Sequence, residues 1–293
     1  QLALRRGTVQ IADGVWMPLL ANGITTDPGV WLRAGGRHLD TAFLYGDAQQ
    51  ALVGRAVRES GLPLRNVFVT TKVMCCPTDR CPSFCMEPPN AVGASLTNQT
   101  AQLAHSLELL GLEYVDLLLL HFPCSTWEGT VRAYAALEAA LDRGQARAIG
   151  VSNFNASALE RLLATGARPS VVQNAYSVAG HPAAHGGEGN FCLEGSALYG
   201  STDETLAAAK RHGITMTAYS PLGGVSNVDV AGKCSKVAVA RDRTGAQVGA
   251  RWLTQQGIGA VSATSNPAHA RELLASSEFR LTDGEMAALA ALR

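Results

Sequence analysis

The chain has 293 residues, of which 47% are hydrophobic and 16% are charged, and this composition excludes a largely disordered protein. Lys and Arg together number 24, as do Asp and Glu, so no overall field attracts nucleic acid or an acidic membrane. No apolar run approaches the ~20 residues that span a bilayer, and the first residues lack the apolar core of a signal peptide. We therefore expect a cytoplasmic monomer or small homo-oligomer whose partner is a small molecule.

A β-hairpin is predicted at the start, followed by alternating strands and helices. Asp13 and Gly14 form a turn pair between TVQIA and VWMPLL, which predicts a hairpin lid on one end of a domain. Apolar runs that predict strands follow at LLANG, GRHLDTA, NVFVTTKV, YVDLLLLH, ARAIGVSNF, SVVQNAYS, ITMTAYSPL and IGAVSATS, with amphipathic segments between them. About eight parallel strands is the number that closes a (β/α)8 TIM barrel.

The competing fold is an open, doubly wound α/β sheet, which the same alternation would fit. A dinucleotide-binding sheet of that kind carries a GxGxxG turn after a strand, and the sequence has none there. We therefore predict a single barrel domain over residues 1–293. Local signals predict helix ends: Asp47 with Gln50 as a capping box, and glycines 61, 111, 144 and 166 as left-handed residues after helices.

Ionisable residues stand where predicted strands end, which is where a barrel places its active site. Asp40 closes GRHLDTA with Tyr45 shortly beyond it, Lys72 closes FVTTKV, and His121 closes YVDLLLLH. A lysine ammonium beside a phenol lowers the pKa of the phenol, and an aspartate keeps that lysine charged. His121 can donate a hydrogen bond to a substrate oxygen. The cluster therefore predicts a site that polarises a carbonyl and protonates it.

Each of these residues, taken singly, also has a structural alternative. Asp40 fits a helix cap, Lys72 fits a side chain that extends to solvent, and His121 fits a hydrogen-bonded core histidine. The cluster contains no set of metal ligands and no nucleophile elbow.

Five segments, DTAFLYGDAQQALVGRAV, FVTTKV, SLELLGLEYVDLLLLHFP, RAIGVSNF and AYSPLG, together resemble the aldo-keto reductase family over nearly the whole chain. The resemblance implies a (β/α)8 barrel, a nicotinamide cofactor and a catalytic tetrad of Asp40, Tyr45, Lys72 and His121, with Tyr45 as the general acid. It also implies cofactor contacts at Ser152, Asn153, Gln173, Tyr219, Ser220 and Leu222, beside the glycines at 223 and 224, and Asp40 is counted among these contacts. The structural alternatives are that Ser152 and Asn153 cap the next helix and that Tyr219 belongs to the core.

The segment AVSATSNPAHARELL departs from the family pattern. Ala263 and His269 stand where the resemblance implies a Lys and an Arg that hold the 2′-phosphate of NADPH. Thr264, Ser265 and Asn266, with the helix that follows, can still bind an anion, and Arg271 lies within a turn of His269. We expect NADP(H) as cofactor, with NAD(H) as the alternative.

Substrate contacts are expected from Ile24, Met74 and Phe122, of which Ile24 replaces a family threonine. The chain stops at Arg293 directly after the last predicted helix, so we expect a relatively open substrate site.

Two further segments are unusual for this family. The first contains Cys75, Cys76, Cys81 and Cys85, and because their spacing lacks paired CxxC knuckles, we expect free thiols in a reducing compartment and not a zinc site. The second is the long segment 180–202, where His181 and His185 have Gly and Ala neighbours that favour a mobile surface loop over a metal site.

The favoured function is an NAD(P)H-dependent reductase of an aldehyde or ketone, or the reverse oxidation. The alternative is a cofactor-binding regulatory subunit with little turnover, because the resembled family includes such channel-associated partners. The complete tetrad favours the enzyme, whereas the altered segment at Ala263 and His269 leaves room for the regulatory protein.

Overall fold

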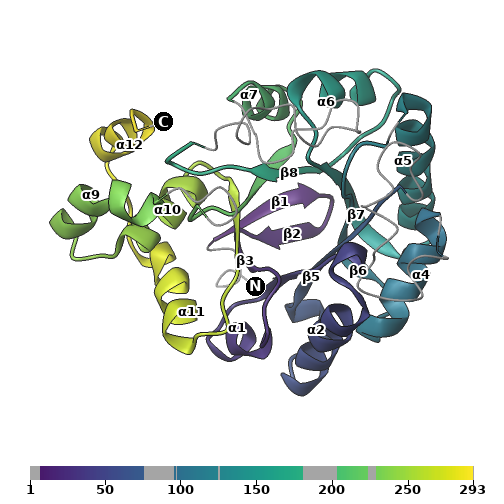
Figure 1. The fold of residues 1–293 in the computed structure, drawn as a ribbon, viewed down its shortest axis with the longest axis horizontal. Helices are drawn as coiled ribbons and strands as arrows, with labels where there is room; N and C mark the ends of the chain where they lie inside the picture. Colours follow the sequence, from purple (N-terminus) through teal and green to yellow (C-terminus); the bar gives the residue numbers. More distant parts are fainter. Residues whose placement is uncertain are drawn as a thin grey trace.

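Eight parallel strands close into a barrel in the order β10-β3-β4-β5-β6-β7-β8-β9 (Figure 1). The computed structural model describes residues 7–75, 96, 98–124, 126–180, 203–223 and 229–292. The strands are β3 (Leu20–Asn22), β4 (His38–Asp40), β5 (Phe68–Val73), β6 (Val115–Leu120), β7 (Ala146–Ser152), β8 (Val171–Ala175), β9 (Thr215–Tyr219) and β10 (Gly259–Ser262). β10 pairs with both β9 and β3, and this closure confirms the predicted barrel over the open sheet.

Helices surround the barrel, as Figure 1 shows. They are α1 (Gly29–Arg33), α2 (Asp47–Glu59), α4 (Gln99–Leu110), α5 (Trp127–Asp142), α6 (Ala156–Leu163), α7 (Asp203–Arg211), α8 (Val230–Lys233), α9 (Ser235–Ala240), α10 (Gly245–Thr254), α11 (Pro267–Leu274) and α12 (Asp283–Ala290), with a short 3-10 helix η2 (Phe43–Tyr45). Every residue of β5 and β6 is buried, because one strand face fills the barrel and the other packs against helices. In the described ranges, no helix is long and apolar enough to cross a membrane.

The predicted N-terminal hairpin is present and closes the end of the barrel where the strands begin. β1 (Thr8–Ala12) and β2 (Val15–Pro18) pair antiparallel. Val15 and Met17 pack against a cluster that includes Phe68, Leu117 and Val171. In Figure 1 the hairpin crosses the middle of the ring of strands. The opposite end, where the strands finish, is therefore the end left for a functional site.

The predicted capping box at the start of α2 is wrong. The residue before the helix, Gly46, makes no side-chain cap. Asp47 instead pairs with His105 of α4 at 2.9 Å, and buried Gln50 accepts a hydrogen bond from Thr71 at 3.4 Å. Both side chains thus have partners in other elements of the fold. The left-handed glycines are confirmed, as at Gly111, which ends α4 with φ 65°.

The expectation of free thiols is wrong for Cys75. The structure joins Cys75, after β5, to Cys124, after β6, in a disulfide. Cys234 is a free, buried thiol. The predictions for Cys76, Cys81, Cys85, Gly224 and segment 181–202 lie outside the described residues. The pairing arises because the barrel brings neighbouring strand ends together across 49 residues of sequence.

Candidate active site at the carboxyl ends of the strands

The centre of the site is the fully buried side chain of Lys72 at the end of β5. Its ammonium contacts the carboxylate of Asp40 and donates hydrogen bonds to the Thr41 carbonyl at 3.0 Å and the Tyr45 hydroxyl at 3.5 Å. Lys72 has 0% exposure, which excludes the alternative that its amine reaches solvent. Asp40 binds this lysine, and the residue before the next helix, η2, is Ala42 with no side-chain cap, so Asp40 does not serve as a helix cap.

Burial and charge oppose each other in this cluster. Burial would lower the pKa of Lys72, but the charge of Asp40 and the hydrogen bonds to Asp40 and Tyr45 raise it above its ordinary value, so the amine stays charged. We expected Lys72 to lower the pKa of Tyr45. The structure reverses the net direction, because burial raises the pKa of the Tyr45 phenol more than the Lys72 ammonium lowers it. Tyr45 is therefore a protonated phenol beside a cation that stabilises its anion.

His121 lies directly after β6 and is held by its backbone. Its N–H donates to the Val73 carbonyl at 2.8 Å, and its carbonyl accepts from the Asn153 amide at 2.9 Å. The imidazole stacks on Phe122 with a centroid distance of 4.5 Å and meets the Tyr45 ring edge-on at 5.8 Å. Burial, with help from the Lys72 charge, lowers the pKa of His121 well below its ordinary value, so the ring is neutral.

His121 is not the hydrogen-bonded core histidine of the structural alternative. Its Nδ1 atom is buried and has no hydrogen-bond partner among the described residues. A buried polar atom without a partner is costly in a finished core and is expected where a ligand or water completes the site.

Hydrogen bonds connect the ends of β7, β8 and β9 to this cluster. Gln173 of β8 donates to the second carboxylate oxygen of Asp40 at 2.9 Å. The hydroxyl of Ser152 donates to the Gln173 carbonyl at 2.7 Å, and Asn153, at φ 60°, accepts from the Tyr219 hydroxyl at 2.8 Å. Asn155, and not Ser152 or Asn153, caps α6, which excludes the capping alternative. Tyr219 is half-buried at the end of β9, outside the closed core.

The second predicted cofactor segment follows β10 and begins α11. Ser265, Asn266 and His269 are exposed, and Asn266 caps α11 by accepting from the Ala268 N–H at 2.8 Å. Both backbone groups of Thr264 bond to Asn22 of β3: its N–H donates to the Asn22 amide oxygen at 2.9 Å, and its carbonyl accepts from the Asn22 amide nitrogen at 3.1 Å.

Sequence reasoning missed Asn22. This residue is 1% exposed, and its only signal was a polar amide inside the apolar run LLANG. Because both groups of its amide bond to the backbone of one residue, Asn22 ties the segment before α11 to the neighbouring strand.

The predicted substrate residues differ in exposure. Met74 is 4% exposed and directly follows β5, the strand that carries Lys72. Phe122 is 6% exposed and directly follows His121. Met74 packs with Phe43 and Leu44 of η2, next to Tyr45. Ile24 is 51% exposed in the segment after β3. The structure therefore brings Met74 and Phe122 to the cluster around Lys72 and leaves Ile24 at the surface.

The residues at this end of the barrel fit a nicotinamide cofactor. Amides and a hydroxyl at Ser152, Asn153 and Gln173 match a carboxamide, and each can bind it through a second donor or lone pair. At Ser220 and Gly223 the backbone is left-handed, with φ 51° and φ 101°, and the Gly223 N–H donates back to the Ser220 carbonyl at 3.0 Å. Leu222 between them is half-buried. Turns of this kind can form a concave surface that binds an anion.

The closed parallel barrel thus brings together, at its strand ends, a phenol, an ammonium and a neutral imidazole, which are groups that can protonate a substrate oxygen. The chain belongs to the aldo/keto reductase family, whose model matches residues 30–293. Members of this family are oxidoreductases that act on carbonyls, so the protein is an oxidoreductase of this kind with a small-molecule substrate.

Individual relatives agree with this membership. An aldo-keto reductase of Mycolicibacterium vanbaalenii is 36% identical over 261 residues, covering 88% of this chain and 79% of that protein. Morphine 6-dehydrogenase of Pseudomonas putida is 30% identical over 302 aligned residues, covering 96% and 89%. A crystal structure of an aldo/keto reductase from Brucella melitensis has 27% identity and a TM-score of 0.74, covering 98% of this chain and 99% of that one.

Proposed function

We propose that the protein is an NAD(P)H-dependent reductase of an aldehyde or ketone, in which Tyr45 donates a proton to the substrate oxygen. The reverse oxidation uses the same groups in the opposite direction, and a relative with the name of a dehydrogenase supports this reversibility. The observation that carries the proposal is the buried ammonium of Lys72 in contact with both Asp40 and Tyr45. An aspartate-held cation beside a protonated phenol is an arrangement for proton transfer.

The chain's own residues divide the work of the reaction. Tyr45 gives its proton to the developing alkoxide, and Lys72 stabilises the phenolate that remains. Asp40 keeps Lys72 charged and in place, and Gln173 fixes the second oxygen of Asp40. Neutral His121 donates a hydrogen bond from an imidazole N–H to the carbonyl oxygen, and because it is neutral it does not replace Tyr45 as the acid. General-acid catalysis of this kind contributes roughly 10²- to 10⁴-fold.

The nicotinamide supplies hydride when bound, which is chemistry that side chains lack. We propose that Ser152, Asn153 and Gln173 hold its carboxamide and that Tyr219 lies against its ring. Ser220 and Leu222 would contact the pyrophosphate. The adenosine end would be bound by Thr264, Ser265, Asn266 and His269. We propose NADP(H) as the preferred cofactor, with NAD(H) accepted.

Two further parts of the proposal concern the whole chain. We propose that residues 1–293 act as a single domain and that the protein is cytoplasmic. Stable disulfides are rare in that compartment, so the Cys75–Cys124 bond would then be one that forms and breaks.

The test is a substitution of the proton donor. Tyr45→Phe keeps the ring and removes the hydroxyl, so NADPH consumption with a panel of aldehydes and ketones should fall about 10²-fold or more, while cofactor affinity stays nearly unchanged. Substitution of Tyr114 by Phe, at a tyrosine between α4 and β6, is the matched control and should retain full activity. Undiminished turnover of the Tyr45 variant would refute the assignment. Cofactor binding without turnover by the wild-type protein would favour the regulatory alternative.

A further inference from the structure

The disulfide lies directly beside the candidate active site. Cys75 is the third residue after Lys72, and Cys124 is the third residue after His121. β5 and β6 are neighbours whose last residues, Val73 and Leu120, are paired. The Cys75 and Cys124 Cα atoms are 5.4 Å apart, a normal separation for a disulfide. The bond therefore joins the two segments that carry the substrate residues Met74 and Phe122.

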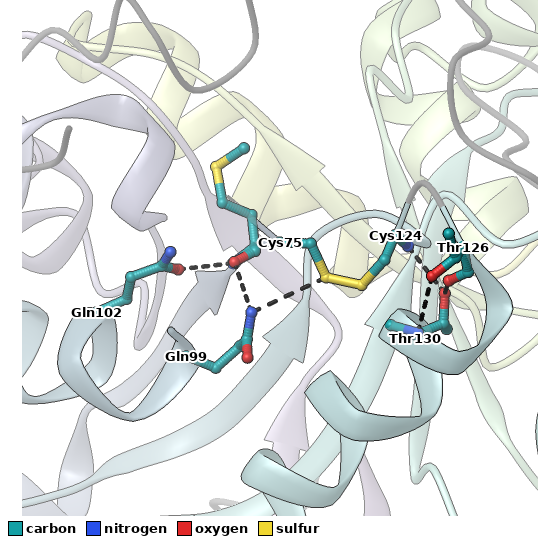
Figure 2. The surroundings of a disulfide bond; sticks show 8 residues. Cys75, Gln99, Gln102, Cys124, Thr126 and Thr130 are labelled. Atoms are coloured by element: carbon teal, nitrogen blue, oxygen red, sulfur yellow. Dashed lines mark hydrogen bonds between the residues drawn. A yellow bond between two sulfur atoms is a disulfide. The ribbon is translucent and has the colours of Figure 1, made fainter. Parts of the chain in front are cut away.

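Each half of the disulfide is attached to a different helix, as Figure 2 shows. On the Cys75 side, the side chains of Gln102 and Gln99 of α4 bind the N–H and the carbonyl of Met74 at 2.8 and 2.9 Å. On the Cys124 side, the Cys124 N–H donates to the Thr130 hydroxyl of α5 at 2.9 Å. After His121, whose N–H donates to the Val73 carbonyl, the hydrogen bonds described for the two segments go to separate helices, and the S–S bond joins the segments.

We propose that Cys75 and Cys124 are a redox-active pair, and that reduction of their disulfide by a dithiol loosens the two segments and weakens substrate binding. A thiolate of the dithiol attacks the Cys75 sulfur, the S–S bond breaks, and Cys124 leaves as a thiolate that takes up a proton. The second thiol of the reductant then attacks the mixed disulfide and releases Cys75 as a thiol. The protein gains two electrons and two protons, and the reductant becomes a disulfide.

The surroundings favour attack at Cys75. Cys75 is partly exposed, whereas Cys124 is 3% exposed and lies against the first turn of α5. At Gly129 of that turn, an added Cβ would come 3.2 Å from the Cys124 Cβ, so glycine permits this close packing. The third described cysteine, Cys234, is buried, and burial raises the pKa of its thiol to about 11, which makes it a poor nucleophile.

The expected functional effect is on binding and not on proton transfer. Asp40 and Lys72 belong to strands and keep their contacts when the segments beyond the strands loosen. Met74 and Phe122 belong to the cross-linked segments. The effect on KM rests on the proposed reductase function. The redox pair itself does not.

The experiment compares the full chain before and after treatment with dithiothreitol, for the wild type, Cys75→Ser, Cys124→Ser and the control Cys76→Ser. Thiol labelling with mass mapping should show that Cys75 and Cys124 become free on reduction. Reduction should lower Tm by about 5 °C or more. It should also speed hydrogen exchange in residues 73–75 and 121–124, and raise the carbonyl KM roughly threefold or more with little change in kcat.

The variants and the readouts separate the possible failures. Cys75→Ser and Cys124→Ser should resemble the reduced wild type in both conditions, and Cys76→Ser should respond as the wild type does. Absence of a Cys75–Cys124 linkage in oxidised protein, or a linkage whose reduction leaves Tm and hydrogen exchange unchanged, would overturn the redox pair. An unchanged KM in an active enzyme would overturn its functional role. Zero turnover in both states would refute the proposed reductase function, and labelling, Tm and exchange would still decide the redox pair.

Discussion

The buried ammonium of Lys72 has a hydrogen-bond acceptor for each of its three N–H groups. Its three N–H donors meet the Asp40 carboxylate, the Thr41 carbonyl and the Tyr45 hydroxyl. Since the Tyr45 oxygen accepts from Lys72, the phenol keeps its own proton for a substrate. An ammonium that only stabilised the fold would not need a titrating phenol as its third partner. This distinction can be tested through the ionisation of Tyr45.

Substitution Lys72→Met should lower turnover and move the pH limb that reports Tyr45 ionisation to higher pH. The Lys72 ammonium lowers the pKa of Tyr45, while burial and Asp40 raise it, so loss of the ammonium leaves only the raising influences. The measurement is kcat/KM as a function of pH, together with a thermal unfolding curve that identifies a folded variant. Lys72→Arg keeps the charge and should retain more of the original profile. A folded Lys72→Met enzyme with an unshifted limb and full rate would show that Lys72 is structural.

The sequence indicated which residues belong to the site, but it did not indicate their burial or their partners. Asp40, Tyr45, Lys72 and His121 could be found because ionisable residues at the ends of apolar runs are conspicuous. The net pKa direction of Tyr45 could not, because it depends on how deeply the phenol is buried. The partner of Cys75 was equally hidden, since it lies 49 residues away.

Secondary-structure elements could be predicted from the sequence more completely than the contacts of single side chains. Every strand of the barrel was expected from an apolar run, because strands that are covered on both faces contain few polar residues. The capping box predicted at Asp47 was wrong because the prediction considered only residues close in sequence. A local rule assumes that side chains near a helix start have no better partner, and here His105 and Thr71 provide one.

The start of α11 should determine cofactor preference. Ala263 and His269 are exposed and replace the Lys and Arg expected there, so discrimination between NADPH and NADH should be weak. Each lost charge-assisted contact removes about 1.5 to 3 kcal/mol of preference for the phosphate. A hydrogen bond from His269 should retain part of it, so His269→Ala should weaken NADPH binding while NADH binding hardly changes.

Fluorescence quenching titrations with both cofactors, for the wild type and the His269→Ala variant, measure this preference. A large preference for NADPH that the variant retains would mean that other residues hold the 2′-phosphate, and the interpretation of Ala263 and His269 would be wrong.

At the scale of the whole molecule, His38 of β4 links the N-terminal hairpin to the barrel. Its Nδ1 lies 2.9 Å from the carbonyl of Pro18, the last residue of the hairpin, and its Nε2 lies 2.9 Å from the Thr70 hydroxyl of β5. A carbonyl can only accept, so Nδ1 carries the proton and Nε2 accepts from Thr70. The neutral imidazole thus connects the hairpin lid to the barrel wall. Its ring also meets Phe68 edge-on at 4.6 Å.

The stability of the fold should therefore decrease in mild acid because of His38. Burial lowers the pKa of His38 from 6.5 to about 4, although the Pro18 carbonyl opposes the shift. Between these values the unfolded chain binds a proton that the folded chain refuses, so the His38 contribution is complete above pH 6.5 and is lost as pH falls toward 4. The full loss is about 3 kcal/mol. Urea unfolding at pH 7.5, 6.5 and 5.5 measures the free energy of unfolding along this range.

The control for this prediction is the difference between variants, since His121 is also buried and neutral and adds to the slope of the wild type. His38→Gln keeps one donor and one acceptor but cannot titrate. It should be less stable than the wild type at pH 7.5, with a deficit that shrinks as the pH falls to 5.5. His269→Gln, at an exposed position, should keep the wild-type dependence on pH. A deficit of the His38 variant that is the same at all three pH values would show that His38 contributes by packing alone and that its charge state does not couple to folding.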